Sequence, residues 1–337
     1  MIRVEYHADL KEVQSDAALA RLLSDSTSRA PFDRIEWWQA LAVHCGIEPV
    51  LAIARDGDSV AVLPLRREGN GFAALGNWYS FRVRPLFSAS AEPARMLGAI
   101  AADLAGRTDR LELRGLGDED GSATQLAEAF REAGWFAVRE PCDVNHFLEV
   151  DGRSYEQYLA TRPGKLRTTL KRKSGKVETR VLTQFDENIW AAYEAIYAES
   201  WKPEEGSPAF LRAFAEAEGT AGRLRLAVAH AGGEAIAAQM WTVEGGTAFI
   251  HKLAHRESAK PLSPGTVLSA ALFRHVIDED KVTTIDFGTG NDGYKRDWME
   301  SVRSRYRLAL YRPLAPRNWP EIMRIGLKRL AATAKRG

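Results

Sequence analysis

The sequence has few cysteines, almost no excess of charge and no long hydrophobic run, and each absence excludes a class of protein. Its two cysteines, Cys45 and Cys142, can form neither a disulfide framework nor a metal cluster, which favours free, buried thiols in a reducing compartment. The 46 basic residues nearly balance the 45 acidic ones, so no overall positive field attracts DNA. We therefore expect no metal site and no DNA partner.

The N-terminus and the hydropathy pattern predict a cytoplasmic protein. Residues 1–6 lack the apolar core of a signal peptide. No run reaches the roughly 18 apolar residues that a membrane span requires. The composition is that of a globular protein, with 45% hydrophobic and 27% charged residues, and 337 residues suit two domains.

The order of predicted elements repeats after about residue 151. Periodicity and turn residues predict for the first half a strand at 2–6, helices near 15–24 and 33–45, three strands within 50–75, a helix at 92–105, a strand at 110–114, a helix at 122–133 and strands near 135–139 and 145–150. For the second half they predict helical turns at 154–173, a strand at 177–184, helices at 187–200 and 208–217, three strands within 224–252, a helix at 265–278 and a strand at 282–287. Repetition over a whole domain indicates a duplicated fold.

A short loop, Ser263-Pro264-Gly265-Thr266, precedes the predicted helix at 265–278. Ser263 or Thr266 can cap this helix and Pro264 suits a first turn, which is a purely structural interpretation. The functional alternative is that the N–H groups of Gly265, Thr266 and Val267 bind the pyrophosphate of an acyl donor, with glycine allowing close approach.

A glycine-rich turn with several chemically active side chains follows the strand at 282–287. Acyl transfer to an amine needs a deprotonated amine, an oxyanion stabiliser and an acid for the leaving thiolate. A tyrosine hydroxyl can donate a proton, and a lysine can stabilise an oxyanion or bind an acidic acceptor. Tyr294 and Lys295 are therefore predicted to be catalytic. Asp286 is a further catalytic candidate and Asp292 an acceptor contact, although either carboxylate could simply form the turn.

The chain resembles the two-domain, FemAB-like branch of the GNAT superfamily, often described as CelD-like (cellulose biosynthesis) acetyltransferases. The segments that show the resemblance are Phe32–Trp37, Leu63–Leu65, Leu75–Ser80, Glu199–Lys202 and, most strongly, Asp286–Gly290 followed by Tyr294–Trp298. The resemblance implies an α/β (α+β) protein of two tandem GNAT folds, each a mixed, largely antiparallel sheet flanked by helices. The expected divisions are 1–150, 151–315 and a basic helix at 316–337.

The resemblance also implies where donor and acceptor bind. The strand that ends at Lys252 would hold the pantetheine arm, so the expected donor contacts are Lys252, Leu253, Ser263, Gly265, Thr266 and Val267. His251 on the same strand is a candidate general base, or else a half-buried, hydrogen-bonded residue. The expected acceptor contacts are Trp37, Tyr79, Ser80, Trp201, Lys202 and Asp292. The first half lacks the Ser-Pro-Gly loop and the Tyr-Lys turn, so we expect it to shape the acceptor pocket without an active site of its own.

The predicted function is transfer of an acyl group, acetyl in the simplest case, from a coenzyme A thioester to the amine of a small molecule, amino sugar or peptide. The donor loop departs from the usual Gln/Arg-x-x-Gly-x-Gly/Ala signature of GNAT enzymes, so other donors stay open. One alternative is a FemX-like peptidyltransferase that uses aminoacyl-tRNA. Another is a long-chain N-acyl amino acid synthase that uses acyl carrier protein. The non-enzymatic alternative is a GNAT fold that binds a ligand without catalysis.

Two basic segments suggest further contacts. Residues 165–176 carry six lysines and arginines without an acidic residue, which is typical of a solvated face or of a docking surface for a phosphorylated or acidic partner. The basic tail has an apolar face formed by Trp319, Ile322, Met323, Leu327 and Leu330. This face would dock on the domain or contact a membrane surface.

Overall fold

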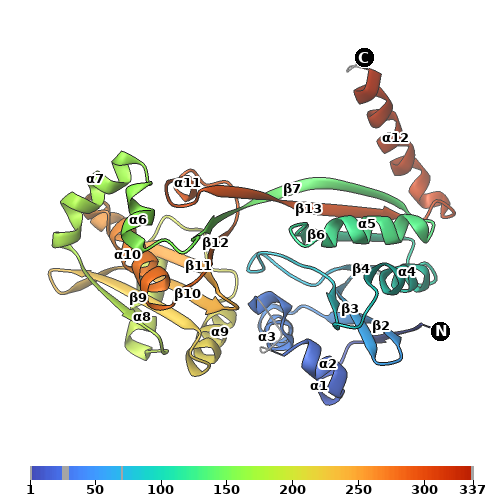
Figure 1. Ribbon diagram of the computed structural model, residues 1–337, viewed down its shortest axis with the longest axis horizontal. Coiled ribbons are helices and arrows are strands. Elements are labelled where there is room, and N and C mark those ends of the chain that lie inside the picture. Colours follow the sequence, from blue (N-terminus) through green and yellow to red (C-terminus); the bar gives the residue numbers. More distant parts are fainter. Residues whose placement is uncertain (1, 25–29, 70, 335–337) are drawn as a thin grey trace.

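The computed structural model describes residues 2–24, 30–69 and 71–334, with side chains described as far as Lys328. Two halves lie side by side and are joined by two long strands (Figure 1). One sheet runs through both halves. Helices cover both of its faces. Alternate residues of the central strands therefore belong to different core clusters.

The first half has helices α1, α2 and α3 on one face of its sheet and helices α4 and α5 on the other. On β2, Leu51 and Ile53 face the first group, whereas Ala52 and Ala54 face the second. The elements in chain order are β1 (Arg3–His7), α1 (Leu10–Ser15), α2 (Ala17–Leu22), α3 (Ile35–Cys45), β2 (Pro49–Asp56), β3 (Ser59–Glu68), β4 (Gly71–Ala74), β5 (Leu86–Phe87), α4 (Pro93–Leu104), β6 (Arg110–Leu116), α5 (Ser122–Glu132) and β7 (Phe136–Glu149).

The second half repeats this arrangement, with α8 and α9 on one face and α6, α7 and α10 on the other. Its elements are α6 (Tyr155–Ala160), α7 (Gly164–Lys173), β8 (Glu178–Leu182), α8 (Glu187–Ala198), α9 (Pro208–Thr220), β9 (Leu224–Ala231), β10 (Glu234–Glu244), β11 (Thr247–His255), α10 (Pro264–Arg274), β12 (Thr284–Thr289), α11 (Lys295–Trp298), β13 (Ser301–Tyr311) and α12 (Trp319–Ala334).

The predicted duplication is confirmed by the order of the strands. The sheet contains β1-β2-β3-β4-β6 in the first half and β8-β9-β10-β11-β12 in the second. The first four strands of each set pair antiparallel, and the fifth pairs parallel with the fourth. Each half is thus a mixed, largely antiparallel sheet, as expected.

The last strand of each half crosses to the sheet of the other half. β13 pairs with β6, β7 pairs with β12, and β7 and β13 pair antiparallel with each other. The sequence predicted two strands near 135–139 and 145–150, but β7 is one long strand that passes through Pro141, opposite a register shift in β13. The division at residue 150 stays a prediction, since β13 follows that boundary in sequence yet completes the sheet of the first half.

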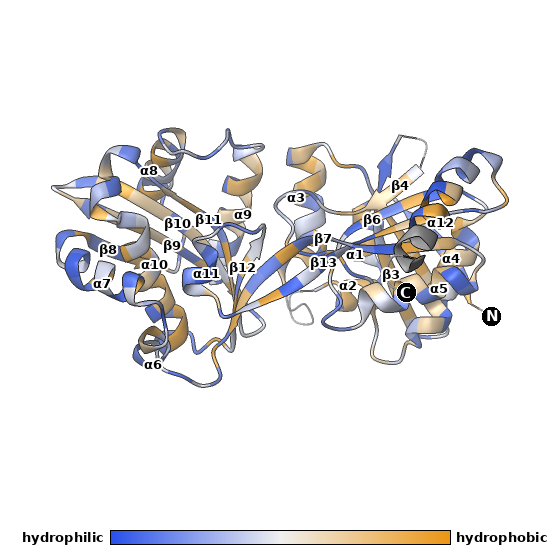
Figure 2. Cartoon of the chain, turned by 90° about the horizontal axis from the view of Figure 1, so that it is seen from above, coloured by the Kyte–Doolittle hydropathy of each residue, from blue (hydrophilic) through white to orange (hydrophobic). Residues whose placement is uncertain are grey.

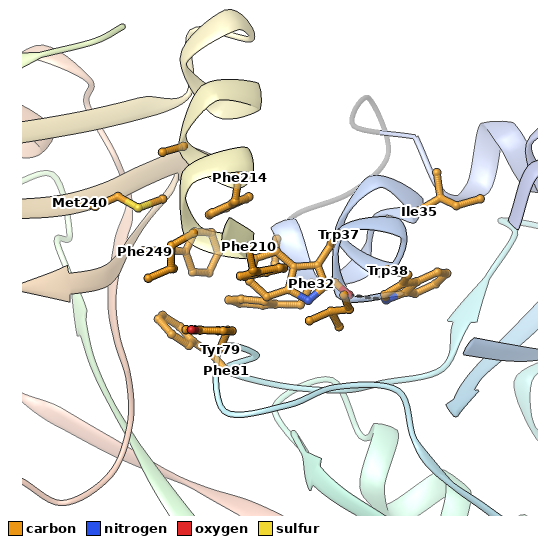
Figure 3. Close-up of a cluster of buried hydrophobic side chains, with 14 of the residues drawn as sticks. Phe32, Ile35, Trp37, Trp38, Tyr79, Phe81, Phe210, Phe214, Met240 and Phe249 are labelled. Carbon is orange, nitrogen blue, oxygen red and sulfur yellow. Dashed lines mark hydrogen bonds between the residues drawn. The ribbon is translucent and has the colours of Figure 1, made fainter. Parts of the chain in front are cut away.

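The two halves share an aromatic core (Figure 3). Trp37 meets Phe210 and Phe214 edge to face, with ring centroids 5.0 and 4.9 Å apart, and Tyr79 stacks on Phe210 at 4.8 Å. Such aromatic pairs favour offset or edge-to-face contacts and bury large areas. Trp37 is only 3% exposed. It therefore holds the two halves together, and this burial does not favour the predicted contact with the acceptor.

A buried ion pair also links the halves. The Arg34 guanidinium lies 2.8 Å from the Glu218 carboxylate and 3.2 Å from Glu244. All three side chains are less than 5% exposed. A buried charge of this kind requires its partner, because water cannot replace it. The relative position of the two halves is thus fixed by polar as well as apolar contacts.

Candidate functional site

The candidate site lies where β11 and β12 separate. The two strands pair in parallel from Thr247 opposite Thr284 to Phe249 opposite Asp286, and no pairing follows beyond that point in the described residues. The N-terminus of α10 lies near the end of β11, since a Cβ at Gly265 would be 3.5 Å from His255 Nδ1, and its residues do not line the cavity described below. It is held to β10 by Gln239, whose side-chain amide donates to the Gly265 carbonyl at 3.1 Å and to Ser269 Oγ at 2.8 Å.

A β-bulge occurs in β11 at this opening. Met240 of β10 lies opposite Lys252 and the next residue, Trp241, lies opposite Ile250, so His251 is an extra residue in β11. A bulge leaves one residue outside the ladder and changes the direction of its neighbours. As a result His251 and Lys252 both face the first half, where they contact Phe81 and Tyr79 respectively.

A cavity of about 200 Å³, which we call the central cavity, adjoins the bulge. It brings together seven of the predicted residues: Lys202, His251, Lys252, Leu253, Asp292, Tyr294 and Lys295. Trp78 and Phe81 from the first half also line it, which supports the expectation that the first half shapes the site. Tyr197, Gly288 and Thr289 were not predicted and lie there as well.

Three lysines with lowered pKa values surround the central cavity. Burial is the main reason for the lower pKa of Lys202, Lys252 and Lys295. Lys252 Nζ lies 2.6 Å from Glu205, and Lys295 Nζ donates to the Thr289 carbonyl and lies 3.8 Å from Asp292. Lys202 has no carboxylate within ion-pair distance among the described residues; its Nζ lies over the rings of Trp201 and Tyr294. Lys202 is thus the least neutralised of the three.

Tyr294 is the residue before α11, and its ring contacts that of Phe287 edge to face, with ring centroids 5.6 Å apart. Burial raises the pKa of Tyr294 to about 12. Its hydroxyl is therefore protonated at neutral pH and can donate a proton. The protonated state suits the predicted role as an acid for a leaving thiolate, whereas the raised pKa makes the hydroxyl a weaker acid than that of an exposed tyrosine.

His251 lies in an aromatic environment that disfavours its protonation. Phe81 and Phe214 lie 5.3 and 5.1 Å from its ring, and Nε2 is 2.8 Å from Thr242 Oγ1. Burial first, and then the charges of Lys252 and Arg34, lower the pKa of His251 to about 3. A histidine with so low a pKa is a weak proton acceptor at neutral pH, so this environment argues against the predicted role of general base.

Asp286 is a structural residue of the turn. Its Oδ1 accepts from the Asn145 side chain at 2.7 Å and from the Gly288 N–H at 2.8 Å, and its Oδ2 lies 2.6 Å from Arg303. These partners occupy the carboxylate, which is 3% exposed. The prediction that Asp286 is catalytic is not supported, since it does not line the central cavity. Instead, it positions the glycine-rich turn.

Only some of the N–H groups at the start of α10 are available to bind an anion. Ser263 adopts a left-handed conformation, φ 52°, and makes no capping bond with its side chain, so the predicted serine cap is wrong. The Val267 N–H donates to the Ser263 carbonyl at 3.1 Å and is not available to a donor. Gly265 and Thr266 belong to the first turn, whose N–H groups have no intrahelical acceptor. Of the three N–H groups predicted to bind the donor's pyrophosphate, those of Gly265 and Thr266 thus remain candidates.

The other predicted acceptor residues, Trp37, Tyr79, Ser80 and Trp201, do not line the central cavity. The Tyr79 hydroxyl contacts Glu205 and accepts from the Ser207 N–H at 2.8 Å, which joins residues 76–82 of the first half to residues 199–207 of the second. Ser80 Oγ accepts from Trp37 Nε1 at 3.3 Å and lines another cavity, which shares Trp78 and Thr289 with the central cavity. Trp201 is 47% exposed and packs on His255, with ring centroids 4.4 Å apart.

The residues that the sequence did not reveal are Trp78, Tyr197 and Glu205. Tyr197 and Glu205 come from α8 and from the loop after it, where no periodic pattern or motif marks them. Trp78 lies in Leu75–Ser80, one of the segments that show the resemblance, but the sequence does not indicate its contact with Gly206. A Cβ at Gly206 would lie 2.4 Å from the ring of Trp78, which is 67% exposed, so a larger residue there would require the ring to move.

Comparisons with known proteins agree with this geometry. Residues 160–296, which contain β11, the bulge and α10, match the acetyltransferase (GNAT) domain family. The second half has the GNAT fold. No curated protein matches the sequence at a significant level. The predicted fold class is therefore confirmed, whereas the narrower FemAB-like or CelD-like membership stays a prediction.

Three solved structures resemble most of the chain. A tandem GNAT protein from the clavulanic acid biosynthesis pathway is 13% identical, with a TM-score of 0.52, covering 91% of this chain and 98% of that one. FemX is 11% identical, with a TM-score of 0.57 and 90% and 96% of the chains covered. L-PGS from Bacillus licheniformis is 16% identical, with a TM-score of 0.54 and 96% of both chains covered. At these identities the likeness shows the fold alone.

The basic segments lie away from the central cavity. Figure 2 shows α7 as a largely hydrophilic helix on the outside of the second half. On α12, Ile325 packs on β7 and β13 with Ile322 beside it, whereas Trp319, Met323 and Leu327 are more than half exposed. The side chain of Leu330 lies outside the described residues. None of the described helices is long and apolar enough to span a membrane.

Neither cysteine lines the central cavity. Cys45 and Cys142 are free and only partly buried, although the sequence predicted buried thiols. Among the described residues, no group of three or more His, Cys, Asp or Glu side chains is arranged to hold a metal ion.

Proposed function

We propose that the chain is an N-acyltransferase that moves an acyl group, acetyl in the simplest case, from coenzyme A to an amine. The observation that supports this most is the bulge at His251, which lies at the opening between β11 and β12 and beside a cavity with Tyr294 and three lysines. The opening offers an unpaired strand edge, and α10 offers a helix N-terminus. Together they match the two ends of a phosphorylated thioester donor.

The donor binds along β11 in this proposal. Its pyrophosphate accepts hydrogen bonds from the N–H groups of Gly265 and Thr266, where the helix dipole favours negative charge. Its pantetheine arm follows the edge of β11 that has no strand partner beyond Phe249, past Leu253. The thioester then lies at the bulge, beside Lys252.

The chemistry follows from the groups around the bulge. A backbone N–H freed by the bulge, with the nearby lysine charges, stabilises the oxyanion that forms when the amine attacks the thioester carbon. A C–N bond forms and the C–S bond breaks. The amine proton passes to Lys202, whose pKa is lowered by burial, and the leaving thiolate takes a proton from Tyr294.

A macromolecular donor is the second candidate, and the exposed face of α7 favours it. Lys165, Arg167, Lys171 and Arg172 are exposed on this helix, which packs against α10. An aminoacyl-tRNA or an acidic acyl carrier protein could dock there, close to the helix that starts at the donor loop. Binding that weakens steeply with salt would support such a donor.

The test is a thermal shift of the purified protein with acetyl-CoA, longer acyl-CoAs and free coenzyme A. A ligand at 100 times its dissociation constant stabilises the fold by about 2.7 kcal/mol, which is readily measured. Gly265→Pro removes one proposed donor contact and should abolish the shift. Gly164→Pro is the matched control, because Gly164 also follows a proline at the start of a helix, α7, but lies outside the proposed donor loop.

Three outcomes separate the alternatives. A shift that persists in Gly164→Pro and is lost in Gly265→Pro supports the proposed donor site. A shift that is equal in both variants places coenzyme A elsewhere. No shift with any coenzyme A derivative overturns the CoA-dependent function and leaves the macromolecular donors or a binding protein without catalysis.

A further inference from the structure

A second cavity, which we call the acidic cavity, adjoins the central cavity. It has a volume of about 800 Å³ and lies between α8, α9 and residues 199–207. Tyr197 and Lys202 line both cavities. Three acidic residues line this cavity, Glu194, Glu204 and Glu205, together with one lysine, Lys202. Much of the remaining lining consists of the rings of Trp190, Tyr193 and Tyr197. Acidic and aromatic groups together form a suitable environment for a cation.

The protein already pairs one carboxylate of this cavity, that of Glu205, with a cation from the central cavity. The Lys252 ammonium lies 2.6 Å from Glu205, and its Nζ lies 4.8 Å from the Tyr79 ring centroid and 5.5 Å from the Tyr197 ring centroid. A carboxylate flanked by two aromatic rings is the arrangement by which proteins bind ammonium groups. Lys252 thus shows that the site accepts an alkylammonium ion of the size of an amine substrate.

A buried hydroxyl in the acidic cavity also lacks a partner. The Tyr193 side chain is 3% exposed, and its hydroxyl has no hydrogen-bond partner among the described residues. Glu194 and Glu205 line the same cavity as Tyr193. A buried polar group without a partner is costly in a folded protein and commonly marks a place for a ligand or water.

We infer that the acyl acceptor is a cationic amine, which binds in the acidic cavity with one ammonium group against Glu205 in place of the Lys252 ammonium. Its body lies on the rings of Trp190 and Tyr197, and the Tyr193 hydroxyl donates to or accepts from it. Lys202, between the two cavities, then receives the proton of the amine that is acylated. Binding of the cation does not depend on the proposed acyltransferase function, whereas its role as acyl acceptor and the proton transfer to Lys202 rest on that function.

The test measures binding of cadaverine, a diamine, and of pentanediol, a neutral molecule of the same length, by titration calorimetry at about 150 mM salt. We expect cadaverine to bind and pentanediol not to bind. Glu205→Gln should weaken cadaverine binding about tenfold, and Tyr193→Phe should weaken it a few-fold. Lys252→Met should strengthen binding, because it removes the internal competitor. A gain of affinity cannot result from misfolding.

Glu199→Gln is the matched control, because Glu199 lies in the same segment but is paired with Arg256 and does not line the acidic cavity. Equal affinity of Glu205→Gln and Glu199→Gln for cadaverine, or no binding to the unmodified protein, overturns the inference. Binding of acetyl-CoA is measured in parallel. If acetyl-CoA binds and cadaverine does not, the cationic acceptor is refuted and the acyltransferase stands. If only cadaverine binds, the CoA-dependent acyltransferase is refuted and the cation site stands.

Discussion

Replacing His251 with phenylalanine should make the protein less stable at neutral pH and more stable in acid. At pH 7.5 the variant loses the hydrogen bond to Thr242, which costs about 1 kcal/mol. Phenylalanine otherwise suits the aromatic surroundings of this position, which include Phe81 and Phe214. The difference in unfolding free energy at neutral pH is therefore small.

The sign reverses in acid because the pKa of His251 is lower in the folded protein than in the unfolded chain. The unfolded chain takes up a proton below about pH 6.5, whereas the folded protein resists it down to about pH 3. Stability that depends on neutral His251 is thus lost as the pH falls below 6.5, by about 1.4 kcal/mol per unit. At pH 4.5 the loss is about 2.7 kcal/mol, so the variant should exceed the unmodified protein by about 1 to 2 kcal/mol.

The assay is urea unfolding, followed by tryptophan fluorescence, at pH 7.5, 6.5, 5.5 and 4.5. Other titrating groups are common to both proteins and cancel in the difference. Thr242→Val serves as the control, since it removes the same hydrogen bond but keeps the histidine and its pH dependence. If the difference between the His251→Phe variant and the unmodified protein were the same at every pH, the histidine would not be held neutral, and its exclusion as a general base would lose its support.

Four further predictions concern the reaction and the fold. Tyr294→Phe should lower kcat by about 10²- to 10⁴-fold with little change in KM, as measured with a thiol-trapping reagent; a normal kcat would exclude the tyrosine as the acid. The kcat/KM of the unmodified enzyme should increase with pH, and the midpoint of this increase should lie below the usual lysine pKa of 10.5, because burial lowers the Lys202 pKa. Lys202→Met should abolish this increase; if the increase persists in the variant, it belongs to another group. Arg34→Met should destabilise the protein by about 3 kcal/mol or more in urea, because it leaves buried Glu218 without that partner; the exposed Arg212→Met should change stability far less, and similar losses for both would contradict the buried link. Gly288→Ala should cost about 1 to 3 kcal/mol, because its φ is +68° and a Cβ would lie 3.0 Å from the Phe81 ring; an unchanged melting temperature would show that the turn tolerates a side chain.

Local patterns in the sequence were sufficient for most of the elements and for the duplication. The apolar spacing of Ile35, Trp38 and Leu41 predicted α3, which spans Ile35–Cys45. The pattern near 15–24 instead forms the two short helices α1 and α2, because Asp16 caps a new helix by accepting from the Ala18 and Leu19 N–H groups. Crossing of β7 and β13 between the halves could not be predicted, because strand alternation reports which face is buried and not which strand is the neighbour.

The site was predictable where neighbouring residues in sequence are also neighbours in space. Tyr294, Lys295 and Asp292 lie in one turn and line one cavity, as predicted. The low pKa of His251 depends on burial among residues from distant parts of the chain, such as Phe81, about 170 positions away in sequence, so no local pattern reveals it. The bulge depends on the register between β10 and β11, and Glu205 acquires its role only through Tyr79 and Lys252.

The measurement that tests the central claim most directly is hydrogen–deuterium exchange with and without acetyl-CoA. The proposal predicts slower exchange at two places, residues 250–255 of β11 and residues 263–267 at the start of α10, with little change in the first-half strands β2 and β3. Slower exchange that is confined to the exposed face of α7, or no change at either predicted segment, would contradict a thioester donor bound at the bulge.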